Sequence, residues 1–274
     1  MNRLDICIAA FRLKGLREIA SLGHPALPGV RYIVAWQYGP DSPEIIPPEL
    51  AEREDFIIIP NATRGSGANR RVALDAAEAE IVLTSDDDVS YTPGQLSALI
   101  QAFDERPDCD FLTFRYHSDA NPRPYPEHEF DLRKAPKNYF FGGPEIAFRL
   151  APVRRAGVSF NPLFGVGAEF PAGEDEIIVF EMMKAGLRGR FVPLTIAGHE
   201  SDSTGMRGRR DPAIIRAKGA VFGVIHPRTW ALRMISHTLR LKGSPAEKFR
   251  YCRAWLRGYL DLKRITRTTA RRVH

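Results

Sequence analysis

The stretch EIVLTSDDDVS, residues 80–90, runs from an apolar segment directly into three consecutive aspartates. Adjacent carboxylates repel one another, and a carboxylate beside a hydrophobic core loses hydration. A surface turn tolerates such a cluster, but a bound cation or a ligand rich in donors would also offset its cost. The surrounding sequence has to decide between these interpretations.

Residues 80–85 are one of several short apolar runs that alternate with helical patterns. The runs are residues 4–10, 31–37, 55–60 and 80–85, and the helical patterns between them are residues 13–22 and 66–79. The apolar runs are continuous, which is typical of strands buried on both faces. Strand–helix alternation predicts an α/β fold with a mostly parallel sheet and helices on both faces. Ligands bind such sheets beyond the carboxyl ends of the strands, which is where residues 86–88 lie.

The remaining elements extend this α/β pattern and then change to helices alone. We expect a helix at 93–105, a strand at 110–116, a strand at 144–150, a helix at 173–186 ended by Gly186, and a strand at 187–194. The proline-rich segment 117–143 predicts a long loop over one face, and long loops in compact domains are usually functional. A Gly- and Arg-rich loop follows at 198–212. We therefore predict a catalytic domain at 1–212 and a basic helical extension at 213–274.

Charge is distributed unevenly along the 274 residues, whose formal net charge is +6. Residues 1–200 hold 21 Lys/Arg and 29 Asp/Glu, a balance of −8, whereas residues 201–274 hold 18 and 4, a balance of +14. A basic tail suits lipid headgroups, phosphates or nucleic acid, and a solvated face is the alternative.

Cysteine usage and hydropathy indicate the compartment. Cys7, Cys109 and Cys252 are far apart and odd in number, which fits neither a disulfide framework nor a zinc site and suits a reducing cytosol. The N-terminal apolar run is too short for a signal peptide, and no segment approaches the length of a membrane span. We expect a cytoplasmic protein that is not secreted by this route.

Three groups of residues carry candidate chemistry. Asp86 and Asp88 could direct two oxygen ligands at one hard cation such as Mg²⁺ or Mn²⁺, although acidic turns are common. Glu174 and Asp175 open a predicted helix, where capping and the helix dipole are the alternative explanation. His199 follows the last predicted strand and could be a nitrogen ligand or a structural histidine.

The order of these motifs resembles the inverting family 2 glycosyltransferases of the GT-A fold, and galactofuranosyl- and rhamnosyl-type members in particular. DICIAAFR is similar to the family's opening strand, and TRGSGANRRVALDAAEAEIVLTSDDD is similar to its helix leading into Asp-x-Asp. FFGGPEIAFRLAPVRRAGVSFNPLFGVGAEFPAGEDE looks like the acceptor-side segment, and His199 in GHE follows Asp175 by 24 residues. The resemblance covers about residues 4–205.

The chain departs from the family's pattern at a few positions. Ala9 and Arg12 replace a proline and an asparagine of the opening strand, and Arg71 replaces the asparagine of an Arg-Asn pair. No acidic residue follows the second strand, where Trp36 and Gln37 stand. The identity of the nucleotide is therefore not predicted beyond a UDP- or dTDP-type donor.

The resemblance implies a role for each motif. Asp86, Asp88 and His199 would hold Mn²⁺ or Mg²⁺ against the diphosphate, and Asp175 would be the general base in one inverting displacement. The implied donor-binding residues are Ala10, Phe11, Arg12, Arg64, Asn69, Arg70, Asp87 and Arg207; the implied acceptor-binding residues are Glu174, Gly142 and Gly143. The acceptor would be a hydroxyl of a surface glycan or a lipid-linked molecule.

The C-terminal segment has the pattern of a basic amphipathic helix. Phe249, Cys252, Leu256 and Tyr259 recur at helical spacing, and Arg250, Arg253, Arg257 and Arg264 recur on an adjacent face with Tyr251 and Trp255 nearby. Such a helix suits an anionic membrane surface, here the inner face of the cell membrane, or it packs on the catalytic domain.

Two other functions are alternatives to glycosyl transfer. A nucleotidyltransferase on a related fold expects a Gly-rich loop directly after the first strand, and AAFRLKGL lacks those glycines. A polyanion-binding module that uses the basic tail leaves the acidic motifs without a role. The sequence therefore favours the glycosyltransferase, without a nucleic-acid partner.

Overall fold

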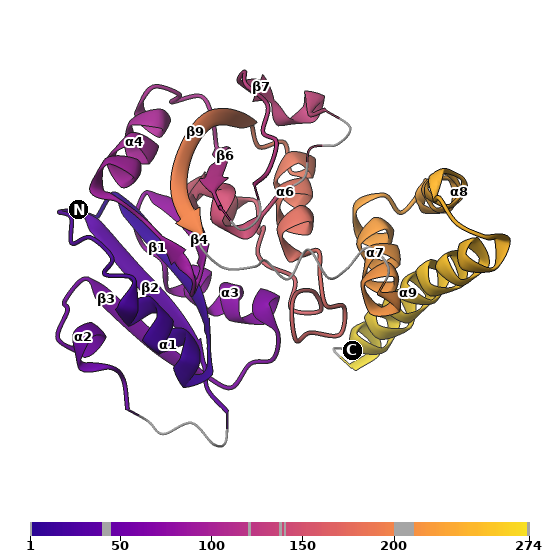
Figure 1. Cartoon of the computed structure of the whole chain (residues 1–274), viewed down its shortest axis with the longest axis horizontal. Coiled ribbons are helices and arrows are strands. Elements are labelled where there is room, and N and C mark those ends of the chain that lie inside the picture. The colour runs from indigo at the N-terminus through magenta and orange to yellow at the C-terminus, as the bar shows by residue number, and fades with distance from the viewer. Residues whose placement is uncertain are drawn as a thin grey trace.

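The computed structural model describes residues 2–39, 45–119, 122–136, 139, 141–199 and 211–272. Within these residues a nine-stranded sheet forms the centre of the molecule, in the order β3-β2-β1-β4-β8-β6-β9-β5, with β7 paired to β9. Figure 1 shows helices packed on the sheet and three further helices, α7 to α9, lying together on one side of it.

The first half of the sheet is parallel, as the sequence predicts. Its strands are β1 (Leu4–Phe11), β2 (Val30–Gln37), β3 (Phe56–Asn61) and β4 (Ile81–Asp86). β1 pairs with both β2 and β4, and β2 pairs with β3, all in parallel. The carboxyl ends of β1 and β4 therefore meet at one edge, where Ala9 lies opposite Asp86.

The second half of the sheet is mixed. Its strands are β5 (Val89–Ser90), β6 (Phe111–His117), β7 (Phe130–Asp131), β8 (Ile146–Arg149) and β9 (Gly189–His199). β8 runs antiparallel to β4 and β6, whereas β6 and β9 are parallel. β9 continues beyond the predicted end at residue 194, because its last residues pair with β6 after a register shift and with β5.

Two hydrophobic cores lie on opposite faces of the sheet. On one face, Ile6 and Ile8 of β1 pack with α1 (Arg12–Ser21) and α4 (Pro93–Asp104). On the other face, Cys7 packs with α3 (Ser66–Ala76), α5 (Leu150–Arg155) and α6 (Glu174–Lys184). Alternate residues of one strand thus reach both cores, which confirms the prediction of helices on both faces.

Local signals explain several element boundaries. The side chain of Thr92 accepts a hydrogen bond from the backbone N–H of Gln95, and the Gln95 side chain accepts one from the N–H of Thr92, so α4 begins with a capping box. Gly186 follows α6 with φ of +88°. α2 (Pro48–Ala51) is a single turn.

The predicted strand 144–150 is wrong at both ends. It begins with a 3₁₀ turn (Gly143–Glu145), and residue 150 already belongs to α5. Only residues 146–149 pair with β4 and β6. Pro144 precedes this short apolar run, and α5 follows it directly. Another 3₁₀ turn (Leu132–Lys134) lies within the predicted loop 117–143.

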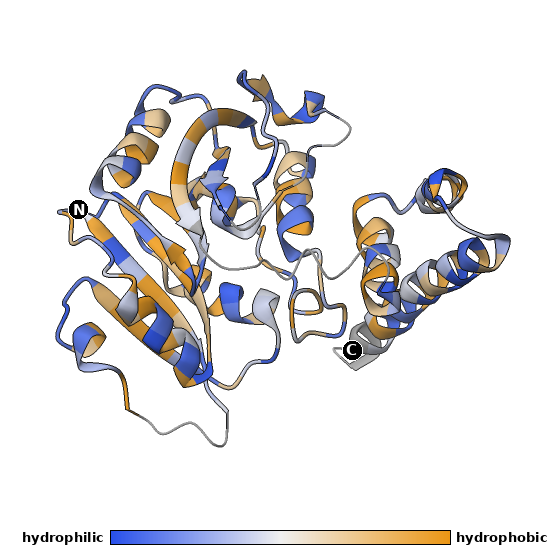
Figure 2. Ribbon diagram, in the orientation of Figure 1, coloured by the Kyte–Doolittle hydropathy of each residue, from blue (hydrophilic) through white to orange (hydrophobic). Residues whose placement is uncertain are grey.

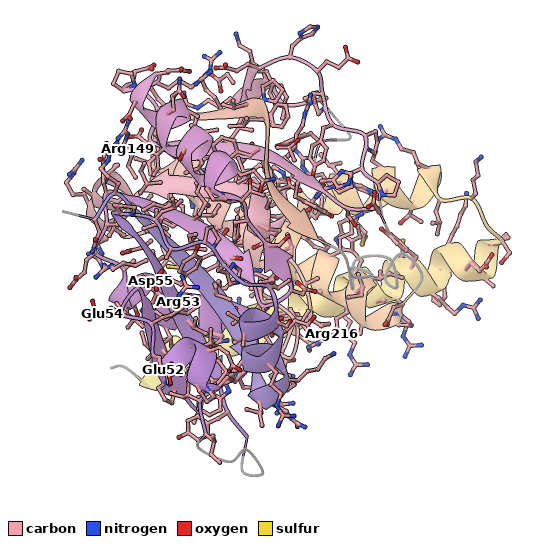
Figure 3. The ribbon with its side chains drawn as sticks, turned by 60° about the vertical axis from the view of Figure 1, so that its left-hand side comes forward. Glu52, Arg53, Glu54, Asp55, Arg149 and Arg216 are labelled. Atoms are coloured by element: carbon pink, nitrogen blue, oxygen red, sulfur yellow. The ribbon has the colours of Figure 1, made fainter. Side chains whose placement is uncertain are left out.

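The C-terminal extension consists of α7 (Pro212–Ile225), α8 (Trp230–Arg240) and α9 (Pro245–Arg272). α7 and α9 pack so closely that a Cβ on Gly219 would overlap the backbone of Trp255. In the same way, a Cβ on Gly258 would overlap the carbonyl of Arg216. Arg216, labelled in Figure 3, joins the two parts of the chain by donating to Glu169 and to Asp261.

A third hydrophobic cluster attaches this extension to the body. The cluster joins residues of α7 to the loop before α6 and to α6 and α9. Its members are Ala217, Ala220 and Val221 of α7, Phe164 and Phe170 of the loop, Ile177 of α6 and Leu262 of α9. Tyr251 and Trp255 are buried in the extension, so their predicted place as interfacial aromatics is wrong. α9 packs mainly on α7 and α8 of the extension, and Phe249 and Leu256 of the predicted stripe are exposed, so the predicted packing of that stripe on the catalytic domain is not confirmed.

Candidate active site

The aspartate cluster lies where β4 ends, beside the end of β1. The carboxylate of Asp87 turns toward α1 and accepts a hydrogen bond from the backbone N–H of Phe11 at 3.1 Å. Gly15 leaves room for this carboxylate, which a Cβ would overlap. Burial raises the pKa of Asp87 to about 6. Asp87 therefore ties the end of β4 to α1, with Asp86 and Asp88 on either side of it.

A buried arginine connects this cluster to the start of α6. Arg70 of α3 donates to Asp86 at 2.6 Å, and its guanidinium lies 3.8 Å from the carboxylate of Asp175. Burial by itself would lower the pKa of Arg70, but the carboxylates of Asp86 and Asp175 raise it above its usual value. The guanidinium crosses Gly143 in the space that a Cβ would occupy. The guanidinium of Arg70 thus lies beside Asp86, the candidate metal ligand, and beside Asp175, the candidate base. It also lies against Gly143 of the acceptor side.

The two acidic residues at the start of α6 have different surroundings. Glu174 accepts a hydrogen bond from the hydroxyl of Ser66 at 2.6 Å. Asp175 Oδ1 is buried and has no hydrogen-bond partner among the described residues. Burial raises the pKa of Asp175, and Arg70 opposes this effect. Glu174 is thus held by a hydrogen bond, whereas Asp175 Oδ1 forms an ion pair with Arg70 at 3.8 Å but accepts no hydrogen bond within the described residues.

Sequence reasoning missed a further buried acid. Glu145 is completely buried, accepts a hydrogen bond from the hydroxyl of Tyr125 at 2.7 Å and forms an ion pair with Arg123. Burial raises the pKa of Glu145 to about 7, although Arg123 opposes this. A single carboxylate inside the apolar run GGPEIAF was the available signal. Both partners come from the predicted loop 117–143, which therefore contacts the site.

The predicted donor-binding residues gather near the ends of β1 and β3. Asn69 donates to the carbonyl of Ala10 at 3.2 Å and accepts from Asn61 at 2.9 Å. Phe11 is exposed at the end of β1, and the Arg12 guanidinium lies 5.1 Å from its ring. Arg12 has φ of +55°, a strained conformation for a residue with a side chain.

The other predicted residues lie farther along the same edge or outside the description. Arg64 donates to the carbonyl of Gly167 at 3.3 Å, and Gly142 accepts from the backbone N–H of Glu145 at 3.1 Å. The backbone of His199 pairs with Val89, the residue after Asp88. The side chain of His199 and all of Arg207 lie outside the described residues.

A divalent cation would find carboxylate oxygens at this edge. In the part of the chain that the structure describes, no three His, Cys, Asp or Glu side chains form a metal-binding group. Asp86 and Asp88 by themselves supply the hard oxygen ligands that Mg²⁺ and Mn²⁺ prefer, and Mg²⁺ usually adds waters and substrate phosphates to one or two carboxylates. Asp86 already accepts a hydrogen bond from Arg70, and the divalent cation at this edge stays a prediction.

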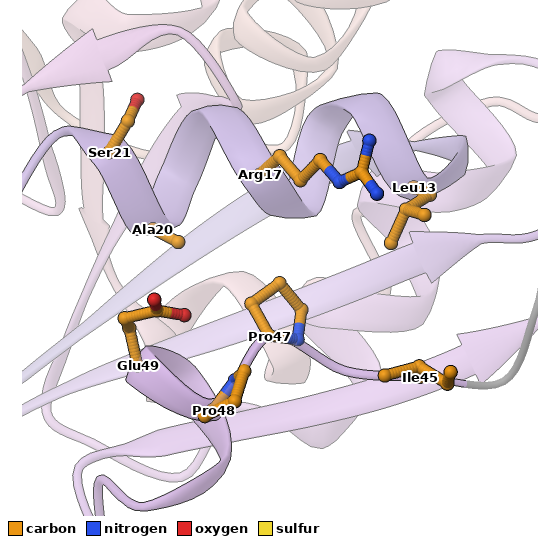
Figure 4. Close-up of a pocket in the computed structure, with 8 residues that line it drawn as sticks. All are labelled: Leu13, Arg17, Ala20, Ser21, Ile45, Pro47, Pro48 and Glu49. Carbon is orange, nitrogen blue, oxygen red and sulfur yellow. The ribbon is translucent and has the colours of Figure 1, made fainter.

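A separate pocket of about 470 Å³ lies between α1 and residues 45–49, which include the start of α2 (Figure 4). It is lined by Leu13, Arg17, Ala20, Ser21, Ile45, Pro47, Pro48 and Glu49. None of the predicted site residues is among them.

Comparisons with known proteins agree with this fold. Residues 39–160 match the family model of glycosyl transferase family 2. Among curated proteins, none matches the chain. The fold is similar to that of S. aureus TarS 1-349, with a TM-score of 0.59 and 16% identity over 96% of this chain and 73% of that chain.

Two ligand complexes of TarS 1-349 show the same likeness. The complex with UDP-GlcNAc has a TM-score of 0.63 and 16% identity, covering 94% of this chain and 81% of that chain. The complex with UDP has a TM-score of 0.58 and 17% identity, covering 88% and 75%. The predicted GT-A fold is confirmed, and the family match confirms the predicted class of enzyme.

Proposed function

We propose that this chain, a glycosyltransferase whose residues 39–160 match family 2, moves a sugar from a nucleoside diphosphate to an acceptor hydroxyl with inversion. The observation that carries the proposal is the carboxylate of Asp175. It lies in the site with a buried oxygen that has no hydrogen-bond partner among the described residues. A raised pKa suits a base that must hold a proton for part of the reaction.

The reaction needs a base on one side of the sugar and charge stabilisation on the other. Asp175 would accept the proton of the acceptor hydroxyl, whose oxygen forms the new bond to the anomeric carbon as the bond to the diphosphate breaks. Because one displacement occurs without a covalent intermediate, the anomeric configuration inverts. Arg70 would hold Asp175 in position, since it contacts both Asp175 and Asp86.

The donor and acceptor are proposed at the level of chemical class. The TarS structures with UDP-GlcNAc and UDP support a nucleoside diphosphate sugar, and a UDP- or dTDP-type donor is our proposal here. Asp86 and Asp88, with His199, would hold Mn²⁺ or Mg²⁺, which as a Lewis acid stabilises the leaving diphosphate. Ser66 fixes Glu174, which could then orient a surface-glycan or lipid-linked acceptor.

Replacing Asp175 by asparagine tests the base directly. The side chains are nearly isosteric, but an amide cannot take the proton, so Asp175→Asn should lower kcat by roughly 10²–10⁴-fold. Binding of donor and cation should stay within about a factor of three, because the base acts on the acceptor. The measurement is the transfer rate at saturating donor and cation, together with calorimetric donor binding and the melting temperature.

Asp131→Asn is a matched control, because Asp131 caps a 3₁₀ turn by accepting from the backbone N–H of Arg133 at 2.8 Å. Asparagine caps nearly as well as aspartate, so this variant should keep wild-type kcat and melting temperature. An Asp175→Asn variant that retains a third of wild-type kcat would remove Asp175 from the role of base.

A further inference from the structure

The short helix α8 exposes an apolar stripe although its other side is packed. Leu232, Ile235 and Leu239 are 68%, 49% and 71% exposed. Their spacing of three and four residues places them on one side of the helix. On the packed side, Thr238 is buried and the ring of Trp230 stacks on Tyr259 at 3.9 Å. The core of the extension therefore does not account for the outer stripe.

α9 likewise has one apolar side that is buried and another that is exposed. Tyr251, Trp255 and Leu262 are buried against the other helices of the extension. A second stripe, with Phe249, Leu256 and Leu260 at spacings of seven and four, is 68%, 41% and 54% exposed. In Figure 2 hydrophilic and hydrophobic residues follow one another closely along α8 and α9, whereas the central strands are mostly hydrophobic.

Cations are frequent in the segment that carries these two apolar stripes. Residues 227–274 hold 13 Lys/Arg and two acidic residues, Glu247 and Asp261. Both acids are engaged, Glu247 with the backbone N–H of Ser244 at 2.7 Å and Asp261 with Arg216 at 2.8 Å. A groove of about 970 Å³ along α9 is lined by six cations and three acids: Arg216, Lys242, Arg250, Arg253, Arg257, Arg264, Glu169, Glu247 and Asp261.

We propose that the exposed stripes of α8 and α9 dock this protein on an anionic lipid bilayer. Large apolar side chains beside a surplus of arginines match the boundary between acyl chains and negatively charged headgroups. A second copy of this chain fits less well, because a symmetric contact would bring two arginine-rich surfaces together. Within the described residues, no helix has the length and apolarity needed to cross a bilayer. The contact would therefore be peripheral, and it does not depend on the proposed reaction.

Vesicle co-sedimentation of the full chain, without donor or acceptor, tests the proposal. Wild type should partition onto vesicles of phosphatidylcholine mixed with phosphatidylglycerol at least about tenfold better than onto phosphatidylcholine alone, and added salt should weaken binding. Leu239→Ser should lower partitioning several-fold. The combined Leu232→Ser, Ile235→Ser and Leu239→Ser variant should lower it by more than about tenfold.

Ile45→Ser is the matched control for Leu239→Ser, since Ile45 is 69% exposed but lies in the catalytic domain. Its partitioning should equal that of wild type. For the cations, Arg250→Gln with Arg253→Gln should lower partitioning about tenfold at low salt. Lys14→Gln with Arg17→Gln, two exposed cations of α1, should not change it.

A tryptophan at position 239 reports insertion itself. In the Leu239→Trp variant, anionic vesicles should shift the added fluorescence to shorter wavelength, as expected for an indole that enters the bilayer boundary. Equal partitioning of the triple serine variant and wild type would overturn the proposal, as would failure of wild type to bind anionic vesicles. A wild-type dimer that the triple variant converts to monomer in analytical ultracentrifugation would assign the stripes to a second copy instead.

Discussion

At the carboxyl ends of β1 and β4 the molecule buries charge, whereas in the α8–α9 pair it exposes apolar side chains. Arg70 and Glu145 are among the most buried charged residues described, and Asp175 has a buried oxygen without a hydrogen-bond partner there. In the extension, Leu239 and Phe249 lie in solvent. Each arrangement is unfavourable for the isolated chain. Each is therefore a place where a ligand or surface would supply the missing partners.

The two regions are also physically connected. Val221 of α7 fills the space above Gly173, where a Cβ would overlap it, directly before Glu174 and Asp175. Gly173 has φ of +100°, which glycine adopts without strain. The extension thus supports the turn that places the candidate base. Substitutions in one region, taken from the largest expected effect on free energy to the smallest, test whether that region can change without the other.

Loss of the central aromatic ring of the extension should have the largest effect. Trp255→Ala removes a fully buried side chain that contacts Phe222 at 4.9 Å between ring centroids, so the free energy of unfolding should fall by about 3–5 kcal/mol. Leu260→Ala, at an exposed position of the same helix, should change it by less than about 0.5 kcal/mol. Chemical denaturation measures both. Similar values for the two variants would contradict the packing described for α9.

Removal of the candidate cation ligand Asp88 should stop turnover at the site beside the carboxyl ends of β1 and β4 and leave the extension folded. Asp88→Ala should lower turnover by about 10²-fold or more and abolish the part of donor binding that depends on Mn²⁺ or Mg²⁺. The melting temperature without donor should hardly change. Asp75→Ala, which removes an exposed carboxylate of α3, is the control. Calorimetry that finds Mn²⁺ and donor bound as tightly as by wild type would take Asp88 out of the site.

A methyl group on Gly143 should displace the guanidinium of Arg70. Because this cation contacts Asp86 and Asp175 together, Gly143→Ala should lower kcat by about tenfold through misplacement of the base. Gly94→Ala adds the same methyl group to α4, where nothing lies within 4 Å, and should leave kcat unchanged. If both variants turned over at the wild-type rate, the position of Arg70 would not matter for catalysis.

The pH dependence of stability should show the smallest effect. Since the pKa of Glu145 is raised to about 7 in the fold, its stabilising contribution is full below the unfolded pKa of about 4.3 and is lost as pH rises toward 7. Glu145→Gln, which imitates the protonated form, should therefore gain about 1 kcal/mol of stability relative to wild type between pH 4 and pH 8.

Glu129→Gln should behave in the opposite way. Arg106 and Arg190 donate hydrogen bonds to Glu129 and lower its pKa, so its contribution is present above the unfolded pKa and is lost as pH falls. The variant should be less stable than wild type at pH 7 and approach it at acid pH. The measurement is the melting temperature of each variant relative to wild type across the pH range. If both variants were stabilised, or both were destabilised, at pH 7, the assignment for Glu145 would be refuted.

Much of the fold was predictable because local patterns carry it. Continuous apolar runs marked the four parallel strands, and the predicted helix at 93–105 agrees with α4 (Pro93–Asp104). The strand at 144–150 was mispredicted because an apolar run looks the same in a strand, a turn and a short helix. The double-sided character of α9 also escaped the pattern, because two apolar stripes on one helix differ only in which neighbours cover them.

By itself, the sequence determined the α/β order, the placement of three aspartates after a buried strand, and the acidic start of α6. These follow from periodicity and from the rule that parallel strands end at a common edge. Only the tertiary structure decided that Arg70 joins Asp86 to Asp175, that Glu145 is a buried partner of Arg123, and which apolar residues of the extension stay exposed. These contacts join residues far apart in the chain, and burial depends on the packing of all surrounding elements, which no local pattern encodes.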